Sequence, residues 1–159
     1  MSQAVPLMAL AASVGAGLIA GVFFAFSTFV MRGLAGVSPE AGVAAMQSIN
    51  RTVFHPLMMG LFIGLVPAGL VFAGLAWYHG WTGWEFIVAG AALYAVGTFG
   101  ITAAFNVPLN NALDAVEAGS AQADELWARY LDRWTFWNHM RTIAAVLAAA
   151  AYALALIGF

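Results

Sequence analysis

The chain has 159 residues, of which 64% are hydrophobic and 8% are charged, and its formal net charge is −2. A soluble domain carries roughly 25% charged residues, so this chain could not cover its surface in water and is expected to be an integral membrane protein. The slightly acidic balance excludes the basic surface that nucleic-acid binding needs. The lack of cysteine and lysine excludes disulfides, cysteine-ligated metals and Schiff-base catalysis by lysine.

Four long apolar stretches follow one another along the chain, and each is long enough for a membrane span of about 20 residues. They predict transmembrane helices at residues 4–31, 57–78, 86–105 and 136–159. The predicted fold is therefore all-α, a four-helix transmembrane bundle that occupies residues 1–159 as a single integral membrane domain.

The two longer connections are predicted to carry short helices that do not span. In the first, Ser38 is a candidate N-cap before Pro39, and an amphipathic helix follows to about residue 54, ahead of a break at Pro56. In the second, the polar segment 112–133 is expected to contain a surface helix, with its acidic residues on a solvated face. Residues 79–85 form a short turn with interfacial tryptophans.

The arginines predict the orientation of the bundle. Neither terminus nor the 79–85 turn carries a basic residue, whereas the two longer connections carry Arg32, Arg51, Arg129 and Arg133. The positive-inside rule then places both connections in the cytoplasm and both termini outside. The alanine- and arginine-rich composition is typical of GC-rich bacteria, which indicates a bacterial cytoplasmic membrane.

Small residues recur at spacing four on the first two predicted spans. Such stripes let helices approach closely in lipid, either within the bundle or between copies in a homo-oligomer. They comprise Ser13, Gly17, Gly21 and Ala25 on the first span and Gly60 and Gly64 on the second.

Polar residues gather at the cytoplasmic end of the predicted bundle, in three stripes with helical spacing. Stripes at a common depth predict a shared polar pocket in the inner third of the membrane. The stripes are Gln47, Arg51 and His55, then Thr98, Thr102 and Asn106, and finally Trp134, Trp137, Asn138 and Arg141; Asn50 and Asn110 lie close to them in the sequence.

Arg141 stands out because it lies about a turn inside the fourth predicted span. A charge at mid-membrane costs at least ~2.5 kcal/mol on insertion scales, although an arginine near the interface can extend towards water. Asn138 on the same face favours a functional arginine. Trp134 and Trp137 share this face, so they form either a wall for a flat apolar ligand or part of an interfacial belt.

His55 directly precedes Pro56, where it is either a general base or a helix cap. If a metal or haem is bound, His55 and His139 are the first candidate ligands. No third ligand has a suitable spacing, so neither a metal nor another cofactor is predicted.

Several segments resemble the anthrone oxygenase-like family of small integral membrane proteins, which was formerly a domain of unknown function. The resemblance rests on a P-x-N-x-x-L pattern, a W-x-x-x-N-x-x-R pattern and two further segments. The first pattern contains Pro108, Asn110 and Leu113, the second contains Trp134, Asn138 and Arg141, and the further segments are 23–31 and 47–51.

The resemblance implies cofactor-independent oxidation, by molecular oxygen, of a flat apolar phenolic or anthrone-type substrate. It implies that His55 is the base, with Arg141, Asn138 and Asn110 as partners of the developing oxyanion. The substrate-binding residues would be Trp134, Trp137, Asn106, Asn50 and Arg51. The alternative is a non-enzymatic membrane protein that binds haem, metal, quinone or lipid, or a subunit of a larger membrane complex.

Overall fold

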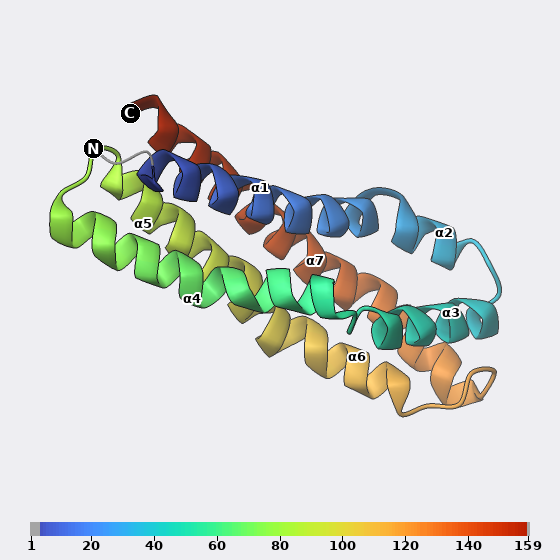
Figure 1. Ribbon diagram of the computed structural model, residues 1–159. Coiled ribbons are helices and arrows are strands. Elements are labelled where there is room, and N and C mark those ends of the chain that lie inside the picture. Colours follow the sequence, from blue (N-terminus) through green and yellow to red (C-terminus); the bar gives the residue numbers. More distant parts are fainter. Residues whose placement is uncertain (1–3, 159) are drawn as a thin grey trace.

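The computed structural model describes residues 4–158, and all its regular secondary structure within this range is helical (Figure 1). Residues 1–3 and 159, at the two ends of the expected domain, lie outside the described residues. The elements are α1 (Ala4–Ala25), η1 (Phe26–Val30), α2 (Met31–Ala35), α3 (Pro39–Thr52), α4 (Pro56–His79), α5 (Trp84–Ala92), η2 (Leu93–Gly100), η3 (Thr102–Asn106), α6 (Val107–Asp114), α7 (Ala121–Ala155) and η4 (Leu156–Gly158).

Three of the continuous helices are long and apolar enough to cross a membrane. They are Ala4–Ala35, Pro56–His79 and Trp84–Asp114, and they overlap the first three predicted spans. The all-α class is confirmed. The last predicted span corresponds to the second half of α7. That half is less apolar than the other three, because its apolar stretch begins only after Arg141 and the helix ends at Ala155.

The expected separate surface helix in segment 112–133 is wrong. After a turn that contains Gly119 at φ 86°, residues 121–133 form the start of α7, which continues without a break for 35 residues. The Ser120 side chain caps this helix by accepting a hydrogen bond from the Ala123 backbone N–H at 3.1 Å. No glycine or proline occurs between Ala121 and Ala155, so nothing in the backbone ends the helix where the polarity changes.

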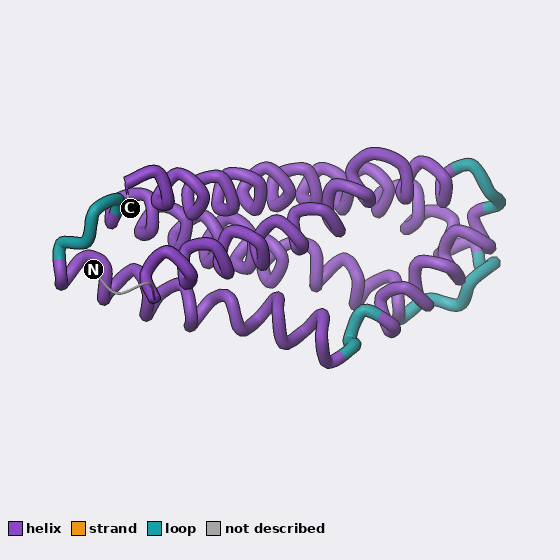
Figure 2. The backbone as a smooth tube through the Cα atoms, turned by 45° about the horizontal axis from the view of Figure 1, so that its top comes forward, coloured by secondary structure: helices purple, strands orange, loops and turns teal. Residues whose placement is uncertain are grey.

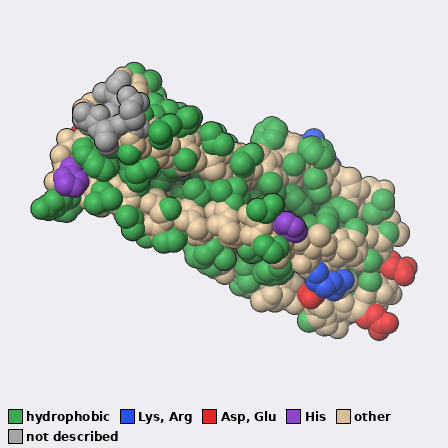
Figure 3. All heavy atoms as spheres, in the orientation of Figure 1, with side chains coloured by type: hydrophobic (Ala, Val, Ile, Leu, Met, Phe, Trp, Pro, Cys, Tyr) green, Lys and Arg blue, Asp and Glu red, His purple; other side chains and the backbone are tan. Residues whose placement is uncertain are grey.

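The long segments lie roughly lengthwise beside one another (Figures 1 and 2). Helix α7 packs along α1 and along the α5–η2 segment, and α4 packs against α5 and α1. The beginning of α1, the α4–α5 turn and the end of α7 share one end of the molecule, whereas α2, α3, α6 and the beginning of α7 share the other (Figure 1). Most charged side chains in view lie towards this second end (Figure 3).

Three segments are π-helical, which the sequence did not predict. They are η1, η2 and η3, and they hold the polar residues Ser27, Thr98, Thr102 and Asn106. The wider turn of a π-helix is rare and often marks a functional site. All four side chains lie on the two long segments that flank the middle of α7.

The glycines that pack tightly are not those of the predicted stripes. A Cβ added at Gly17, Gly21, Gly60 or Gly64 would have no non-local neighbour within 4 Å. In contrast, a Cβ added at Gly97 would lie 2.6 Å from the Ala144 Cβ on α7.

Gly97→Ala is therefore expected to destabilise the protein by about 1–3 kcal/mol, because neither backbone carrying the two methyl groups can move away cheaply. Thermal unfolding in mild detergent measures the effect. Gly74→Ala is the matched control, since a Cβ there meets no atom within 4 Å and the gain in helix propensity applies equally. Equal unfolding temperatures for the two variants would contradict this account of the η2–α7 contact.

Candidate functional site

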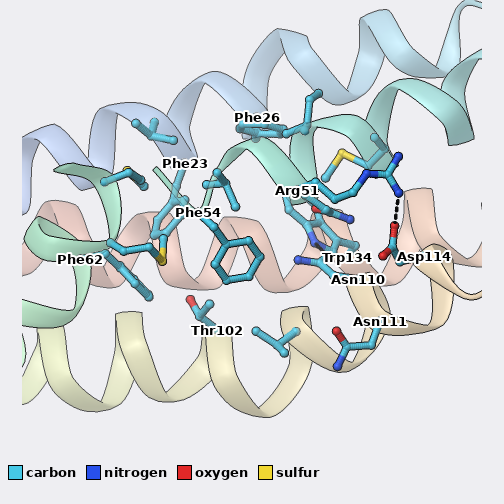
Figure 4. Close-up of a pocket in the computed structure, with 18 of the residues that line it drawn as sticks. Phe23, Phe26, Arg51, Phe54, Phe62, Thr102, Asn110, Asn111, Asp114 and Trp134 are labelled. Carbon is cyan, nitrogen blue, oxygen red and sulfur yellow. Dashed lines mark hydrogen bonds and ion pairs between the residues drawn. The ribbon is translucent and has the colours of Figure 1, made fainter. Parts of the chain in front are cut away.

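A cavity of about 210 Å³ lies among α1, the α3–α4 connection, the η3–α6 segment and α7 (Figure 4). Its wall is predominantly apolar, with a small number of polar groups, as is usual for a site that binds an apolar ligand. The apolar lining consists of Val22, Phe23, Phe26, Met46, Ile49, Val53, Phe54, Met58, Met59, Phe62, Val107 and Trp134, and the polar lining of Asn50, Arg51, Thr102, Asn110, Asn111, Asp114 and Arg141.

Arg141 contributes a buried charged group to the cavity wall and is only 6% exposed. Its Nε and Nη2 donate to the Asn138 Oδ1 at 3.1 and 2.9 Å, and its Nη1 donates to the Thr102 Oγ1 at 3.3 Å. A guanidinium carries five N–H groups, so these three bonds leave two for a ligand. The continuous α7 and the π-helical η3 together fix the orientation of this side chain.

The Arg141 charge is held without a carboxylate. The only ion pair among residues 4–158 joins Arg51 to Asp114. The Arg141 Cζ instead lies 4.0 Å from the centre of the Phe23 ring and 4.9 Å from that of Trp134, where the faces of the rings stabilise a cation. A buried cation with neutral partners favours a ligand that brings a negative charge.

Asn138 supports Arg141 from behind and does not line the cavity. Its Nδ2 donates to the Phe23 backbone oxygen at 2.8 Å and to the Ser27 Oγ at 2.7 Å. Because both amide hydrogens are used, Asn138 has no donor left for a substrate oxyanion. In the structure Asn138 thus lies behind Arg141 and accepts its hydrogen bonds, whereas the sequence predicted a direct contact with the substrate oxyanion.

Asn110 presents an amide group at the cavity wall. Its Oδ1 accepts hydrogen bonds of 2.7 Å from both the Tyr130 hydroxyl and the Trp134 Nε1, which orients the Nδ2 donors away from those side chains. Burial raises the pKa of Tyr130, more than neighbouring Asn50 and Arg141 lower it, so the phenol stays a neutral donor. Tyr130 lies in the part of α7 that precedes the expected span.

Asn50 adds another free donor, since it is 9% exposed and its Nδ2 has no hydrogen-bond partner among the described residues. Arg51 lies at the cavity edge, where its Nη1 donates to the Asp114 Oδ1 at 2.9 Å. Asn106 is fully buried outside the lining and donates from Nδ2 to the Trp134 backbone oxygen at 3.1 Å. The structure thus brings Asn50, Arg51 and Asn110 to the cavity, with Asn106 behind it.

Three other predicted residues lie away from the cavity. His55 is exposed at the start of α4, where its Nδ1 accepts a 3.3 Å hydrogen bond from the Leu57 backbone N–H. Trp137 stacks on Phe105 with ring centres 3.7 Å apart. His139 is exposed on α7. Among the described residues, no three His, Cys, Asp or Glu side chains form a group that could hold a metal ion.

Sequence reasoning missed three polar residues of the site, namely Ser27, Asn111 and Asp114. Ser27 accepts from Asn138 and lies 3.1 Å from the Thr142 hydroxyl, and a polar residue in an otherwise apolar span could have indicated it. Asp114 was grouped with the solvated acidic residues, but it lines the cavity. Asp114 is the last residue of α6 and lies four residues after Asn110, so helical spacing from Asn110 could have indicated its place in the site.

The fold and cavity define a class: an all-helical protein with three helices able to span a membrane and a mainly apolar cavity that contains a buried arginine. The sequence profile of the anthrone oxygenase family matches residues 51–151, more than half of the chain. The chain belongs to the anthrone oxygenase family. This match includes Asn110, Asn138 and Arg141. No curated protein and no solved structure matches the chain.

Proposed function

We propose that this protein is a membrane oxygenase that oxidises a flat, apolar phenolic or anthrone-type substrate with molecular oxygen and needs no cofactor. The observation that carries the proposal is Arg141, a buried cation without a carboxylate partner in the wall of an apolar cavity. The flat rings of such a substrate would pack against the aromatic side chains of the cavity. Its oxyanion would accept hydrogen bonds from the two free N–H groups of the guanidinium.

The chemistry requires the substrate to lose a proton from its methylene carbon. The electron pair of the broken C–H bond then resides largely on the oxygen of the substrate's carbonyl group. The resulting anion reduces dioxygen and forms a C–O bond at the same carbon, giving a hydroperoxide. Loss of water from this hydroperoxide leaves a second carbonyl. One O₂ is consumed, and one quinone and one water are formed. Arg141, Asn110 and Asn50 supply hydrogen-bond donors to the anion, and Trp134 supplies an aromatic wall.

We further infer a four-helix transmembrane bundle in which the second half of α7 is the fourth span. The packing of α7 along α1 and α5 supports this, as does the position of the beginning of α1 and the end of α7 at the same end of the molecule (Figure 1). We place that side outside a bacterial cytoplasmic membrane and the arginine-rich side inside it. The open faces at Gly17 and Gly21 and at Gly60 and Gly64 support a homo-oligomer.

Oxygen uptake by the detergent-purified protein tests the proposal. With an anthrone, we expect one O₂ consumed per quinone formed, at a rate that follows protein concentration and survives chelators. An absorption spectrum and metal analysis of the same sample test the alternative role. A Soret band or stoichiometric metal, with no anthrone-dependent uptake, would instead support a binding protein, for which His55 and His139 remain the first candidate ligands.

A further inference from the structure

We propose that Asp114 is the base that removes the substrate proton; this rests on the oxygenase function proposed above. The proposed reaction needs a group that accepts a proton, whereas the other polar side chains of the cavity mainly donate hydrogen bonds. Among the residues that line it, the ones with an ionisable side chain are Arg51, Asp114 and Arg141. Arginine remains protonated in proteins, so the Asp114 carboxylate is the lining group with lone pairs that can accept a proton.

The position of Asp114 suits proton transfer. Its Oδ1 accepts the hydrogen bond from Arg51, and its Oδ2 has no hydrogen bond with the described residues. The side chain is 44% exposed, so a proton taken from the cavity can pass on to water. Figure 4 shows Asp114 and Arg51 together at one end of the cavity, beyond Asn110 and Trp134. A flat substrate that contacts Arg141 with its oxygen can extend towards this end.

The step is a proton transfer that balances without an oxidant. The methylene C–H bond breaks, and an O–H bond forms at the Asp114 Oδ2, directly or through one water. The electron pair stays on the substrate as the oxyanion beside Arg141. Arg51 is a positioning residue here, because its hydrogen bond fixes the carboxylate at the cavity edge.

Asp114→Asn tests the proposal in the full-length protein in mild detergent. We expect kcat to fall about 100-fold or more, within the usual range for losing a general base. Binding of the quinone product, followed by tryptophan fluorescence, should change little, since Asp114 does not hold the oxyanion. Formate or acetate should restore part of the rate, because the site is open to solvent.

Two further variants separate a lost base from a lost ion pair. Glu117→Gln removes an exposed carboxylate outside the cavity lining and should retain the parent rate. Arg51→Gln breaks the same ion pair but keeps the carboxylate, so its loss of kcat should be smaller and formate should not restore it. If Arg51→Gln and Asp114→Asn lose kcat equally, the carboxylate is no base and the proposal is overturned.

His55→Gln is the competing variant. Loss of kcat in this variant, with Asp114→Asn fully active, would assign the base to His55 and overturn the proposal. An active parent protein with an active Asp114→Asn variant would overturn the base assignment and leave the oxygenase function standing. A parent protein without any oxygen uptake would contradict the oxygenase function itself, so the two failures are distinguishable.

Discussion

Replacing Arg141 with glutamine is expected to reduce kcat/KM for anthrone oxidation by about 10²- to 10³-fold, the usual range for losing one donor to an oxyanion. The loss follows from the position of the guanidinium, which is the one buried cation of the cavity wall and has two N–H groups to spare. Oxygen uptake measured against substrate concentration gives the effect on kcat and on KM separately. Both kcat and KM should change, because the Arg141 guanidinium contacts the bound substrate as well as the oxyanion formed from it.

Arg133→Gln is the matched control, since this arginine lies exposed on the same helix two turns earlier and outside the cavity lining. It should retain the parent kcat/KM. A folded Arg141→Gln variant, with a normal elution volume and the parent oxygen uptake, would rule out the oxyanion role and remove the main support for the oxygenase proposal.

Asn138→Asp is expected to lower oxygen uptake almost as much as Arg141→Gln does, by a different mechanism. The substituted carboxylate would keep an oxygen near the Arg141 Nε and Nη2, so the guanidinium stays in place but becomes neutralised by a direct ion pair. The cavity then loses its attraction for an anion. We expect quinone affinity and kcat/KM of the folded protein to fall by about 10² or more. The unfolding temperature should fall as well, because the second carboxylate oxygen would face the Phe23 backbone oxygen and could not donate to it.

The same change from amide to carboxylate at Gln122, which is exposed in the first turn of α7, serves as the control and should leave activity unaltered. If Asn138 acted only as packing, Asn138→Asp would lower stability, but the quinone affinity and kcat/KM of the remaining folded protein would be normal. That pattern would contradict the positioning role of this side chain.

The apolar runs located the first three long helices because lipid thickness fixes the length of a span. The continuity of α7 is not apparent from the sequence, because polar residues give way to apolar ones near Trp134, as they would at the start of a separate span. A helix ends at a cap or a breaker, and α7 has neither there. The π-helical turns also escaped prediction, because they depend on partners from other segments, such as the Asn138 amide beside Phe23 and Ser27.

Helical spacing predicted which side chains of the polar stripe on α7 lie together. Trp134, Asn138 and Arg141 share a buried face of α7, whereas Trp137 lies at the edge of that face and turns to Phe105. The stripe ending at His55 failed for a clear reason. Its spacing requires a helix through residue 55, but α3 ends at Thr52. Pro56 disfavours helical geometry at His55, so the helix cannot continue through that residue.

The polar contacts of α7 also bear on how the chain is assembled during synthesis. Every side chain or carbonyl that engages Asn138 or Arg141 from another segment, namely Phe23, Ser27 and Thr102, precedes α7 in the chain. The ribosome therefore delivers the least apolar long helix last, when its partners already exist. The free-energy cost of burying the guanidinium is offset as α7 packs against these partners, so premature termination before residue 138 should leave the cavity unformed.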